Sequence, residues 1–320
     1  MKLGEREQRI LNIIQQSSNL SVADIAREVG AQHHTVRNIL SLFQEELGLI
    51  QYTPINTCAL GFTEYHVSIG LSGLTMSTVE KLLSRLQESD RVSLVIELAG
   101  RYQCGIWAMN QRQLGDILDG LLGELPGVTV SGINVRQWFR GFGLFLGSPR
   151  SFAGYTLAPG SKTEVIDELD HAILRELSAR TNDCAASLAR VTGKPLSTIN
   201  YRLKQLQEKQ IVLPAVYLLP LQKAGLTRGV FHLQTSSGPA VREQLIRYCR
   251  ETNHVVALAE VTGAWTFEVT AALSTAASPN TFIDSLARVL GSNLLKAEFE
   301  LQCDLVKIDN YPFKSWPFES

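Results

Sequence analysis

Two short polar segments carry the side chains whose types and spacing could do chemistry. Amide, hydroxyl, imidazole and guanidinium groups at successive helix positions can donate to base edges and to phosphates. The candidate DNA-contact residues are Gln32, His33, His34, Thr35, Arg37 and Asn38 in the first segment, and Lys194, Ser197, Thr198, Asn200, Tyr201, Arg202 and Lys204 in the second. The alternative interpretation is that both segments are solvated helix faces, since any exposed helix carries polar residues.

Metal and phosphate binding fit these segments poorly. Adjacent histidines on a helix point about 100° apart, so His33 and His34 do not suit one metal ion, and no third ligand stands near them. Gly193 and Lys194 would need a glycine at the start of a phosphate loop, but that position is Leu188. We expect no metal and no cofactor.

Familiar catalytic motifs are also missing from the sequence. It contains no G-x-S-x-G, no H-E-x-x-H and no dinucleotide fingerprint. Glu260 and Glu268 are isolated carboxylates without a partner in the sequence. This pattern leads us to expect that the protein is not an enzyme.

The composition limits the partners and the location. The 320 residues carry a formal net charge of −1, so DNA contacts would have to come from local patches. No apolar run approaches the roughly 18 residues of a membrane span, and the charged N-terminal segment is unlike a signal peptide. The five cysteines are scattered singly, which is typical of reduced thiols. We expect a cytoplasmic protein without membrane contact or disulfides.

Each polar segment belongs to a block that occurs twice. Gly193 follows Gly30 by 163 positions, and Gly263 follows Gly100 by the same 163. A repeat of this length indicates two copies of one folded module. Any function must therefore suit a pair of modules.

Three helices are predicted at the start of each copy. In the first copy, apolar residues at helical spacing predict helices over 5–16 and 32–46. The helix between them starts after the N-cap Ser21, with Asp24 three residues later. The second copy repeats the pattern, with Pro195 at the start of its third helix. This arrangement is the helix-turn-helix pattern.

A strand and helix pattern follows each block. In the first copy it predicts strand 64–71, helix 78–88, strand 91–99, a turn at Gly100, strand 102–109, a helix over 114–125 and strand 128–138. In the second copy it predicts strand 229–235, helix 241–250, strand 254–262, a turn at Gly263, strand 265–273, helix 281–290 and strand 294–308. The order βαββαβ is the ferredoxin-like arrangement.

Three tracts resemble one family of regulators. Residues 194–211, KPLSTINYRLKQLQEKQI, closely resemble the recognition-helix segment of the Lrp/AsnC (feast/famine) family. The segments LAGRYQCGIWAM and EVTGAWTFEVTAAL resemble the glycine turn of that family's ligand-sensing domain. The resemblance covers almost the whole chain twice. It implies an α+β fold in which two winged helix-turn-helix DNA-binding domains alternate with two ferredoxin-like sensor domains.

Five segments follow from the repeat and the resemblance. They are a helix-turn-helix at 1–52, a sensor domain at 53–140, a linker at 141–163, a second helix-turn-helix at 164–213 and a second sensor domain at 214–320. The linker is rich in Gly, Ser and Pro but also contains Phe142, Leu144, Phe145 and Phe152. We expect part of it to pack on a domain rather than to be a solvated tether.

The two glycine turns are the candidate effector site that the resemblance implies. The residues concerned are Gly100, Arg101, Tyr102, Gly263, Ala264 and Trp265. Amino-acid-sensing members often have an acidic residue after the turn glycine, where this chain has Gln103 and Thr266. Arg101 would favour an anionic ligand and Trp265 offers an aromatic wall. The alternative is that these residues serve only the turns and the core.

The resemblance implies a sequence-specific transcription regulator that binds double-stranded DNA as a covalent pseudo-dimer. Its effector would be an amino acid or a related metabolite. Glu45 and Glu46 stand at the end of the first recognition helix, so a first block used only for assembly is the alternative to two DNA readers. We expect a homodimer or higher homo-oligomer through the sensor domains, because these would expose pairing edges of their sheets and apolar faces of their helices.

An enzyme family shares this layout and provides the second hypothesis. Siroheme decarboxylases look like the same helix-turn-helix plus βαββαβ chain, sometimes fused in tandem. They carry a His-containing motif near the positions of Gly100 and Gly263, where this chain has no histidine. His66 and His232 lie on predicted strands, where a hydrogen-bonded structural histidine is expected.

Overall fold

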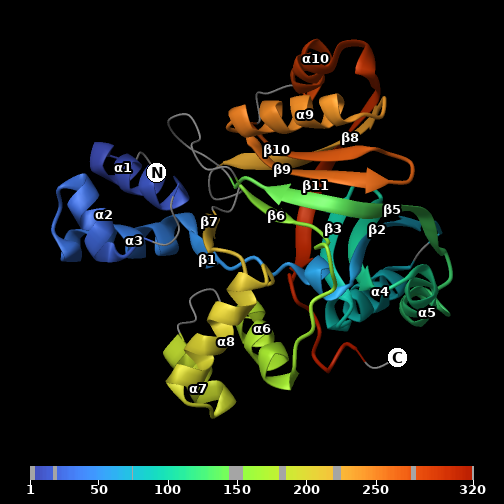
Figure 1. The fold of residues 1–320 in the computed structure, drawn as a ribbon. Coiled ribbons are helices and arrows are strands. Elements are labelled where there is room, and N and C mark those ends of the chain that lie inside the picture. The colour runs from blue at the N-terminus through green and yellow to red at the C-terminus, as the bar shows by residue number, and fades with distance from the viewer. Residues whose placement is uncertain are drawn as a thin grey trace.

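The computed structural model describes residues 4–16, 20–73, 75–143, 154–179, 185–218, 225–274 and 279–318. The fold is α+β, as predicted, with two helical blocks beside a central β-structure (Figure 1). Cys184 and the linker residues Leu144, Phe145 and Phe152 lie outside the described ranges. Within those ranges no helix has the length and apolar character needed to cross a membrane.

The first helix-turn-helix is formed as its punctuation predicts. Its helices are α1 (Glu5–Gln16), α2 (Val22–Val29) and α3 (His33–Leu47). The Ser21 side chain accepts a hydrogen bond from the backbone N–H of Asp24, whose carboxylate accepts one from the Ser21 N–H. Gly30 ends α2 in the left-handed conformation, at φ 65°. The predicted cap and stop are confirmed.

The second block repeats this arrangement. Its helices are α6 (Glu168–Ala179), α7 (Ala185–Thr192) and α8 (Leu196–Glu208). Gly193 adopts φ 66° in the turn, and Pro195 is the N-cap of α8. Each block is followed by a short strand, and the two strands pair with each other: β1 (Ile50–Tyr52) and β7 (Val216–Leu218).

Both sensor domains have the predicted βαββαβ order. The first consists of β2 (Thr63–Leu71), α4 (Met76–Glu88), β3 (Val92–Leu98), β4 (Arg101–Ala108), α5 (Gln111–Leu122) and β5 (Val128–Gly141). The second consists of β8 (Leu226–Thr235), α9 (Pro239–Glu251), β9 (Val255–Thr262), β10 (Phe267–Ser274), α10 (Pro279–Leu290) and β11 (Leu294–Ile308). Gly100 and Gly263 have positive φ in the turns between the middle strands, so the predicted turns are confirmed. Short 3₁₀ turns occupy Thr57–Leu60 and Gly291–Asn293.

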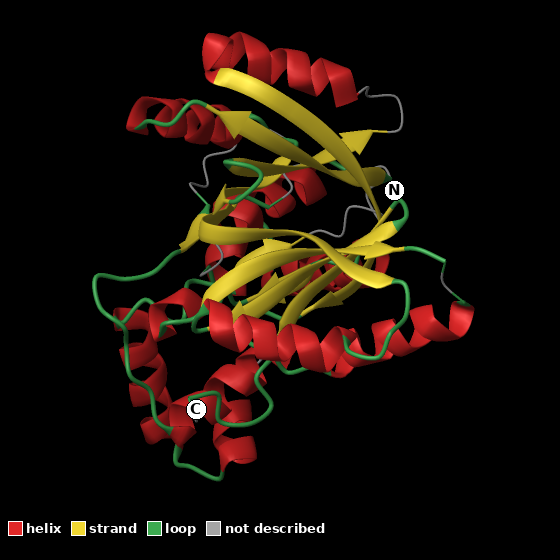
Figure 2. Cartoon of the chain, turned by 90° about the vertical axis from the view of Figure 1, so that its right-hand side faces the viewer, coloured by secondary structure: helices red, strands yellow, loops and turns green. Residues whose placement is uncertain are grey.

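The last strand of each sensor domain crosses into the other copy. The first half of β5 pairs with β2 of its own copy, and its second half pairs with β9. Likewise, β11 pairs first with β8 and then with β3. The strands β2, β4, β3, β11, β8, β10, β9 and β5 therefore close into a ring. Helices α9 and α10 cover one side of this ring, and α4 and α5 cover the opposite side (Figure 2).

This exchange corrects one expectation drawn from the sequence. The edges of β3 and β9, which an isolated ferredoxin-like unit would leave open, are each paired with a strand of the other copy. These two edges are therefore not free for a further dimer, whereas β6 pairs with β5 alone among the described strands. A higher oligomer stays a prediction.

The helical blocks also dock crosswise. The core of α1, α2 and α3 continues onto Ala272 and Val256 of the second sensor domain. The core of α6, α7 and α8 continues onto Phe62 and Trp107 of the first. The C-terminal segment strengthens the second contact, because the Tyr311 hydroxyl lies 2.9 Å from a ring nitrogen of His171 in α6. Each helix-turn-helix is thus held by the other copy's sheet.

The linker supplies one more strand. Residues Tyr155–Leu157 form β6, which pairs with the end of β5. Phe142 is buried in the core of the second sensor domain. These described parts of the linker pack on the domains, as expected.

Candidate functional site

A cavity of about 310 Å³ lies where the two copies meet. Leu94 on β3 and Ala257 on β9 line this cavity, and they are equivalent under the 163-residue shift. The short strands β1 and β7 also contribute residues to the lining. The cavity therefore lies between equivalent elements of the two copies. Its lining consists of Ile50, Tyr52, Ile55, Glu64, Ser93, Leu94, Trp107, Arg136, Phe139, Gly141, Gly143, Tyr155, Leu157, Leu218, Arg228, Val256, Ala257, Gln302, Leu305, Ile308, Asp309 and Asn310.

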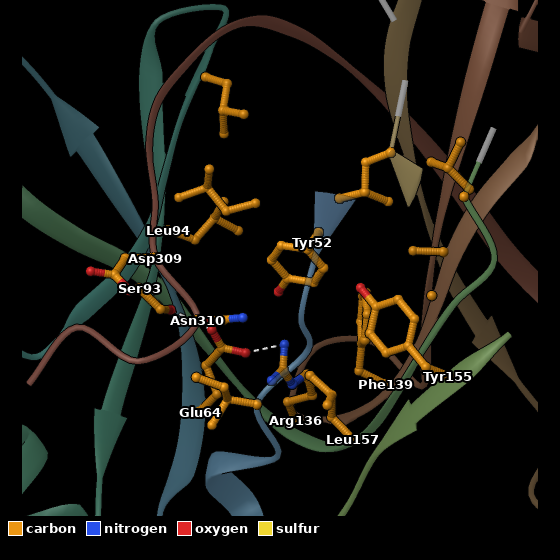
Figure 3. Close-up of a pocket in the computed structure, with 18 of the residues that line it drawn as sticks. Tyr52, Glu64, Ser93, Leu94, Arg136, Phe139, Tyr155, Leu157, Asp309 and Asn310 are labelled. Carbon is orange, nitrogen blue, oxygen red and sulfur yellow. Dashed lines mark hydrogen bonds and ion pairs between the residues drawn. The ribbon is translucent and has the colours of Figure 1, made fainter. Parts of the chain in front are cut away.

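Arg136 is the first charged group of this cavity (Figure 3). Strand β5 carries it, and its side chain is 8% exposed. The guanidinium is ion-paired with the carboxylate of Glu64. It also lies over the rings of Trp107 and Phe139, at 5.3 and 5.2 Å from their centroids. These contacts fix one orientation of a desolvated cation at the cavity wall.

Glu64 is held on several sides. Burial raises the pKa of its carboxyl, but the charge of Arg136, the neighbouring His66 and a hydrogen bond from Ser93 outweigh burial and lower the pKa to about 2. Gly105 on the adjacent strand makes room for this group. A Cβ there would lie 2.6 Å from both the Glu64 and the Ser93 side-chain oxygens. Glu64 is therefore ionised at neutral pH.

Arg228 is the second arginine of the cavity, which also contains the carboxylates of Glu64 and Asp309, and it differs from Arg136 in that no ion pair is found for it among the described residues. Among the described residues no ion pair or side-chain hydrogen bond of Arg228 is found, and its Nε is buried without a partner. Burial lowers the pKa of this guanidinium, although an arginine still stays charged at neutral pH. Arg228 is half-buried, and a partly desolvated cation is stabilised when a ligand supplies an anion.

Two phenols stand near these cations. Tyr52 comes from β1, and Tyr155 comes from the linker strand β6 (Figure 3). Gly141 permits this approach, because a Cβ there would overlap the Tyr155 ring. Burial raises the pKa of Tyr52 to about 12 and raises that of Tyr155 well above its usual value. Both phenols are therefore protonated at neutral pH and can donate hydrogen bonds or a proton.

A row of buried titratable side chains continues from Glu64 away from the cavity. The Glu64 carboxylate lies 3.8 Å from Nε2 of His66, whose Nδ1 lies 2.7 Å from Glu268 on β10 of the other copy. His232 follows, at 3.6 Å from Glu268, and its Nε2 lies 3.0 Å from Glu300. In this way the row crosses the boundary between the copies.

The predicted DNA-contact residues of the first block lie at the start of α3. Gln32, His33, His34, Arg37 and Asn38 are exposed, while Thr35 is half-buried. Gln32 is the N-cap residue but makes no side-chain capping bond. In the described ranges, no group of three His, Cys, Asp or Glu side chains could hold a metal ion.

The predicted residues of the second block divide into two groups. Lys194, Ser197, Asn200, Tyr201 and Lys204 are exposed around the start of α8, while Thr198 is half-buried. Arg202 instead turns toward α6, where it is ion-paired with Asp167 at 2.7 Å and Asp170 at 3.3 Å. Its guanidinium is therefore already engaged inside the block.

The predicted effector residues lie at two hairpin turns, outside the cavity lining. Gly100, Arg101 and Tyr102 belong to the turn between β3 and β4, and Gly263, Ala264 and Trp265 to the turn between β9 and β10. Arg101 is ion-paired with Glu300 of the other copy. Trp265 packs on the ring of His232 and under the ammonium group of Lys296, 4.9 Å from the ring centroid.

The sequence reasoning missed the residues that the cavity brings together. Arg136, Arg228, Tyr52 and Tyr155 are far apart in the chain and belong to no motif. The one available signal was a charged residue on a strand otherwise rich in apolar residues, such as Glu64. That signal identifies a buried polar group but not its partners.

One family model and several solved structures are similar to this chain. A family model described as winged helix-turn-helix DNA-binding matches residues 166–212. The crystal structure of the siroheme decarboxylase NirDL matches 97% of this chain and 95% of its own, at TM-score 0.62 and 14% identity. Its complex with an iron-uroporphyrin III analogue matches over the same shares at TM-score 0.59 and 14% identity. An AsnC family regulator from Agrobacterium tumefaciens matches 48% of this chain and 97% of its own, at TM-score 0.40 and 19% identity. A search of curated proteins found no match.

These matches correct the expectation that the protein is not an enzyme. That expectation rested on missing motifs, yet an enzyme has this same architecture along nearly the full length of both chains. The absence of familiar motifs therefore does not separate a regulator from an enzyme on this fold. At 14% identity the match establishes the shared fold alone, and the family model adds a winged helix-turn-helix at residues 166–212.

Proposed function

We propose that the chain is an enzyme of the siroheme decarboxylase type, which binds an anionic tetrapyrrole at the cavity between its two copies. The observation that carries this proposal is Arg228, a half-buried arginine whose Nε is buried without a hydrogen-bond partner and for which no ion pair is found among the described residues. A carboxylate of the substrate would supply the missing charge. A structure of the same fold was determined with an iron-uroporphyrin III analogue.

The remaining walls suit the same class of ligand. Tetrapyrroles of this type are flat aromatic rings with carboxylate side chains, and the cavity combines the rings of Trp107 and Phe139 with the cations of Arg136 and Arg228. Its volume of about 310 Å³ is at the small end of the range for ligand pockets. We propose that the carboxylate-bearing edge of the macrocycle enters the cavity.

Decarboxylation requires a proton as well as a binding site. When the bond between a side-chain methylene and its carboxylate breaks, CO₂ leaves and the electron pair stays on carbon, which must then take up a proton to become a methyl group. Tyr52 and Tyr155 keep their protons at neutral pH and face the cavity. We assign the proton donation to this pair, which regains its proton from water. Siroheme decarboxylases carry a histidine motif that this chain lacks. We propose that the two phenols donate the proton in its place.

A titration with iron-uroporphyrin III tests the proposed binding. The absorbance of the bound macrocycle should saturate at one equivalent per chain, and Arg228→Gln should weaken binding about ten- to a hundredfold, as expected for a lost charge-assisted hydrogen bond. The control is Arg247→Gln, which removes an exposed positive charge from α9. Incubation with siroheme should yield products lighter by CO₂ in mass spectrometry. No saturable binding, or equal effects of both variants, would refute the proposal.

DNA binding is the second candidate function, favoured by the family model that matches residues 166–212. We propose that Lys194, Asn200 and Lys204 would contact DNA from the second block, while the first block binds an unequal half-site or serves assembly only. Selection of bound fragments from random DNA by the purified chain tests this role. Binding that shows no sequence preference and no dependence on Lys194 or Lys204 would argue against it.

A further inference from the structure

We propose that His66 is a positioning residue that, as an imidazolium ion, holds Glu64 and thereby fixes Arg136 in the cavity. The inference rests on the proposed ligand site, because its role is to orient a cation for an anionic ligand. His66 itself does not line the cavity. It acts through Glu64, which does.

The contacts of His66 and of its partner Glu268 come from three strands of both copies. Its Nδ1 lies 2.7 Å from Glu268 on β10, and its Nε2 points toward Glu64 at 3.8 Å without a hydrogen-bond partner. The amide of Asn134 on β5 donates to Glu268 at 3.2 Å and helps to hold it. The imidazole ring is therefore placed between two carboxylates, one from each copy.

The pKa shifts of His66 and Glu268 indicate whether this row of side chains holds Arg136 in place or conducts protons. Burial lowers the pKa of His66, but Glu268, followed by Glu64, outweighs burial and raises the pKa to about 9. Burial raises the pKa of Glu268, but His66 and His232 lower it well below its usual range. A proton leaving His66 for either carboxylate would move strongly uphill, so the row is a poor conductor. It holds a fixed alternation of Arg136, Glu64, His66 and Glu268.

Four titratable or charged groups near His66 take part in this balance among the described residues. They are Glu64 on the same strand, Arg136 on β5, Glu268 on β10 and, beyond Glu268, His232 on β8. Protonated His66 lies between the carboxylates of Glu64 and Glu268, and Arg136 lies on the other side of Glu64. Loss of the His66 proton removes the cation opposite Arg136 and leaves Glu64 with Arg136 as its charged partner.

The arrangement exists in one copy only. Leu94 and Ala257 pair with Gly105 and Thr270, which in turn pair with His66 and Val230, so Val230 is the counterpart of His66. The position of Glu64, two residues before His66, corresponds to Arg228. The carboxylate that holds an arginine thus has no counterpart in the second copy, which predicts one ligand per chain rather than two.

A pH series of ligand binding tests the positioning role. The probe is metal-free uroporphyrin III, followed by fluorescence from pH 6 to 10, because its carboxylates stay ionised and no metal-bound water titrates. The affinity of the wild-type chain should fall at least about fivefold as His66 loses its proton. His66→Gln should already have the weak affinity at pH 7 and lose the pH dependence. His33→Gln, which changes an exposed histidine, should match the wild-type chain.

A second variant separates positioning from a merely structural role. Glu268→Gln removes the main cause of the high His66 pKa, so the midpoint of the binding profile should move to lower pH while affinity at pH 6 is kept. An unchanged profile in both His66→Gln and Glu268→Gln would overturn the inference.

Nitrogen NMR of the ligand-free chain provides the readout if no tetrapyrrole binds. The Nε–H signal of Arg136 should be sharp while His66 is protonated and should broaden in His66→Gln. Failure of uroporphyrin binding alone would therefore count against the proposed function, whereas an unaltered Arg136 signal would count against the positioning role of His66.

Discussion

Replacing His66 by glutamine should change how the stability of the fold depends on pH. The pKa of His66 is about 9 in the folded chain, because Glu268 and Glu64 outweigh burial, and about 6.5 in an unfolded chain. A group whose pKa is raised by folding stabilises the fold fully below pH 6.5, and this contribution is lost as pH rises through 9. At roughly 1.4 kcal/mol per pH unit, the difference corresponds to about 3 kcal/mol.

Urea unfolding at pH 6 to 10 measures this contribution. The wild-type chain should be about 3 kcal/mol more stable than His66→Gln at pH 6, and the difference should shrink toward zero at pH 10. The exposed His33→Gln variant should follow the wild-type chain across the whole range. Parallel curves for the wild type and His66→Gln would refute the reasoning, because they would mean that His66 titrates alike in the folded and unfolded chains.

Three further substitutions test other parts of the structure. Gly105→Ala should lower the free energy of unfolding by about 1–3 kcal/mol, because a methyl group there would lie 2.6 Å from two buried oxygens; Gly115→Ala, in open space on α5, should be neutral or stabilising in the same urea experiment. Tyr155→Phe keeps the ring, so the melting temperature should stay within a few degrees while CO₂ release from siroheme falls at least about tenfold; unchanged turnover would remove the phenol from the reaction. If the second block binds DNA, Lys204→Ala should reduce the slope of affinity against salt by about one, whereas Arg202→Ala should mainly lower stability, since its charge is engaged within the block; equal salt slopes for both would contradict this division.

The sequence was a sufficient guide to everything that depends on local order. Apolar spacing predicts the helices, Ser21 and Gly30 mark the ends of α2, and the glycines at 100 and 263 form the predicted turns. These features need only neighbouring residues, so their physics is visible in a short window.

Neither the strand exchange of β5 nor the cavity could be predicted from such short windows. Alternating residues predict that 128–138 is a strand, but nothing in them says that its second half pairs with β9 of the other copy. Tyr155 came from a segment that composition identifies as a linker, and Arg228 from the start of a strand. Their common function depends on contacts between residues that are distant in the chain, which periodicity does not contain.

The exchange of β5 and β11 between the copies has a consequence for how this protein can change over evolution. In a dimer of identical chains, every substitution appears twice, so a carboxylate gained on one side of the axis is also gained on the other. Here the two copies that meet are encoded by different parts of one gene, so a substitution occurs on one side of the interface only. The pairing of His66 with Gly105 in one half, and of Val230 with Thr270 at the equivalent place in the other, is a difference that only a fused chain can accumulate. The cost is that neither half keeps a complete sheet of its own, so the gene can diverge between its halves but cannot be divided without exposing both strand edges.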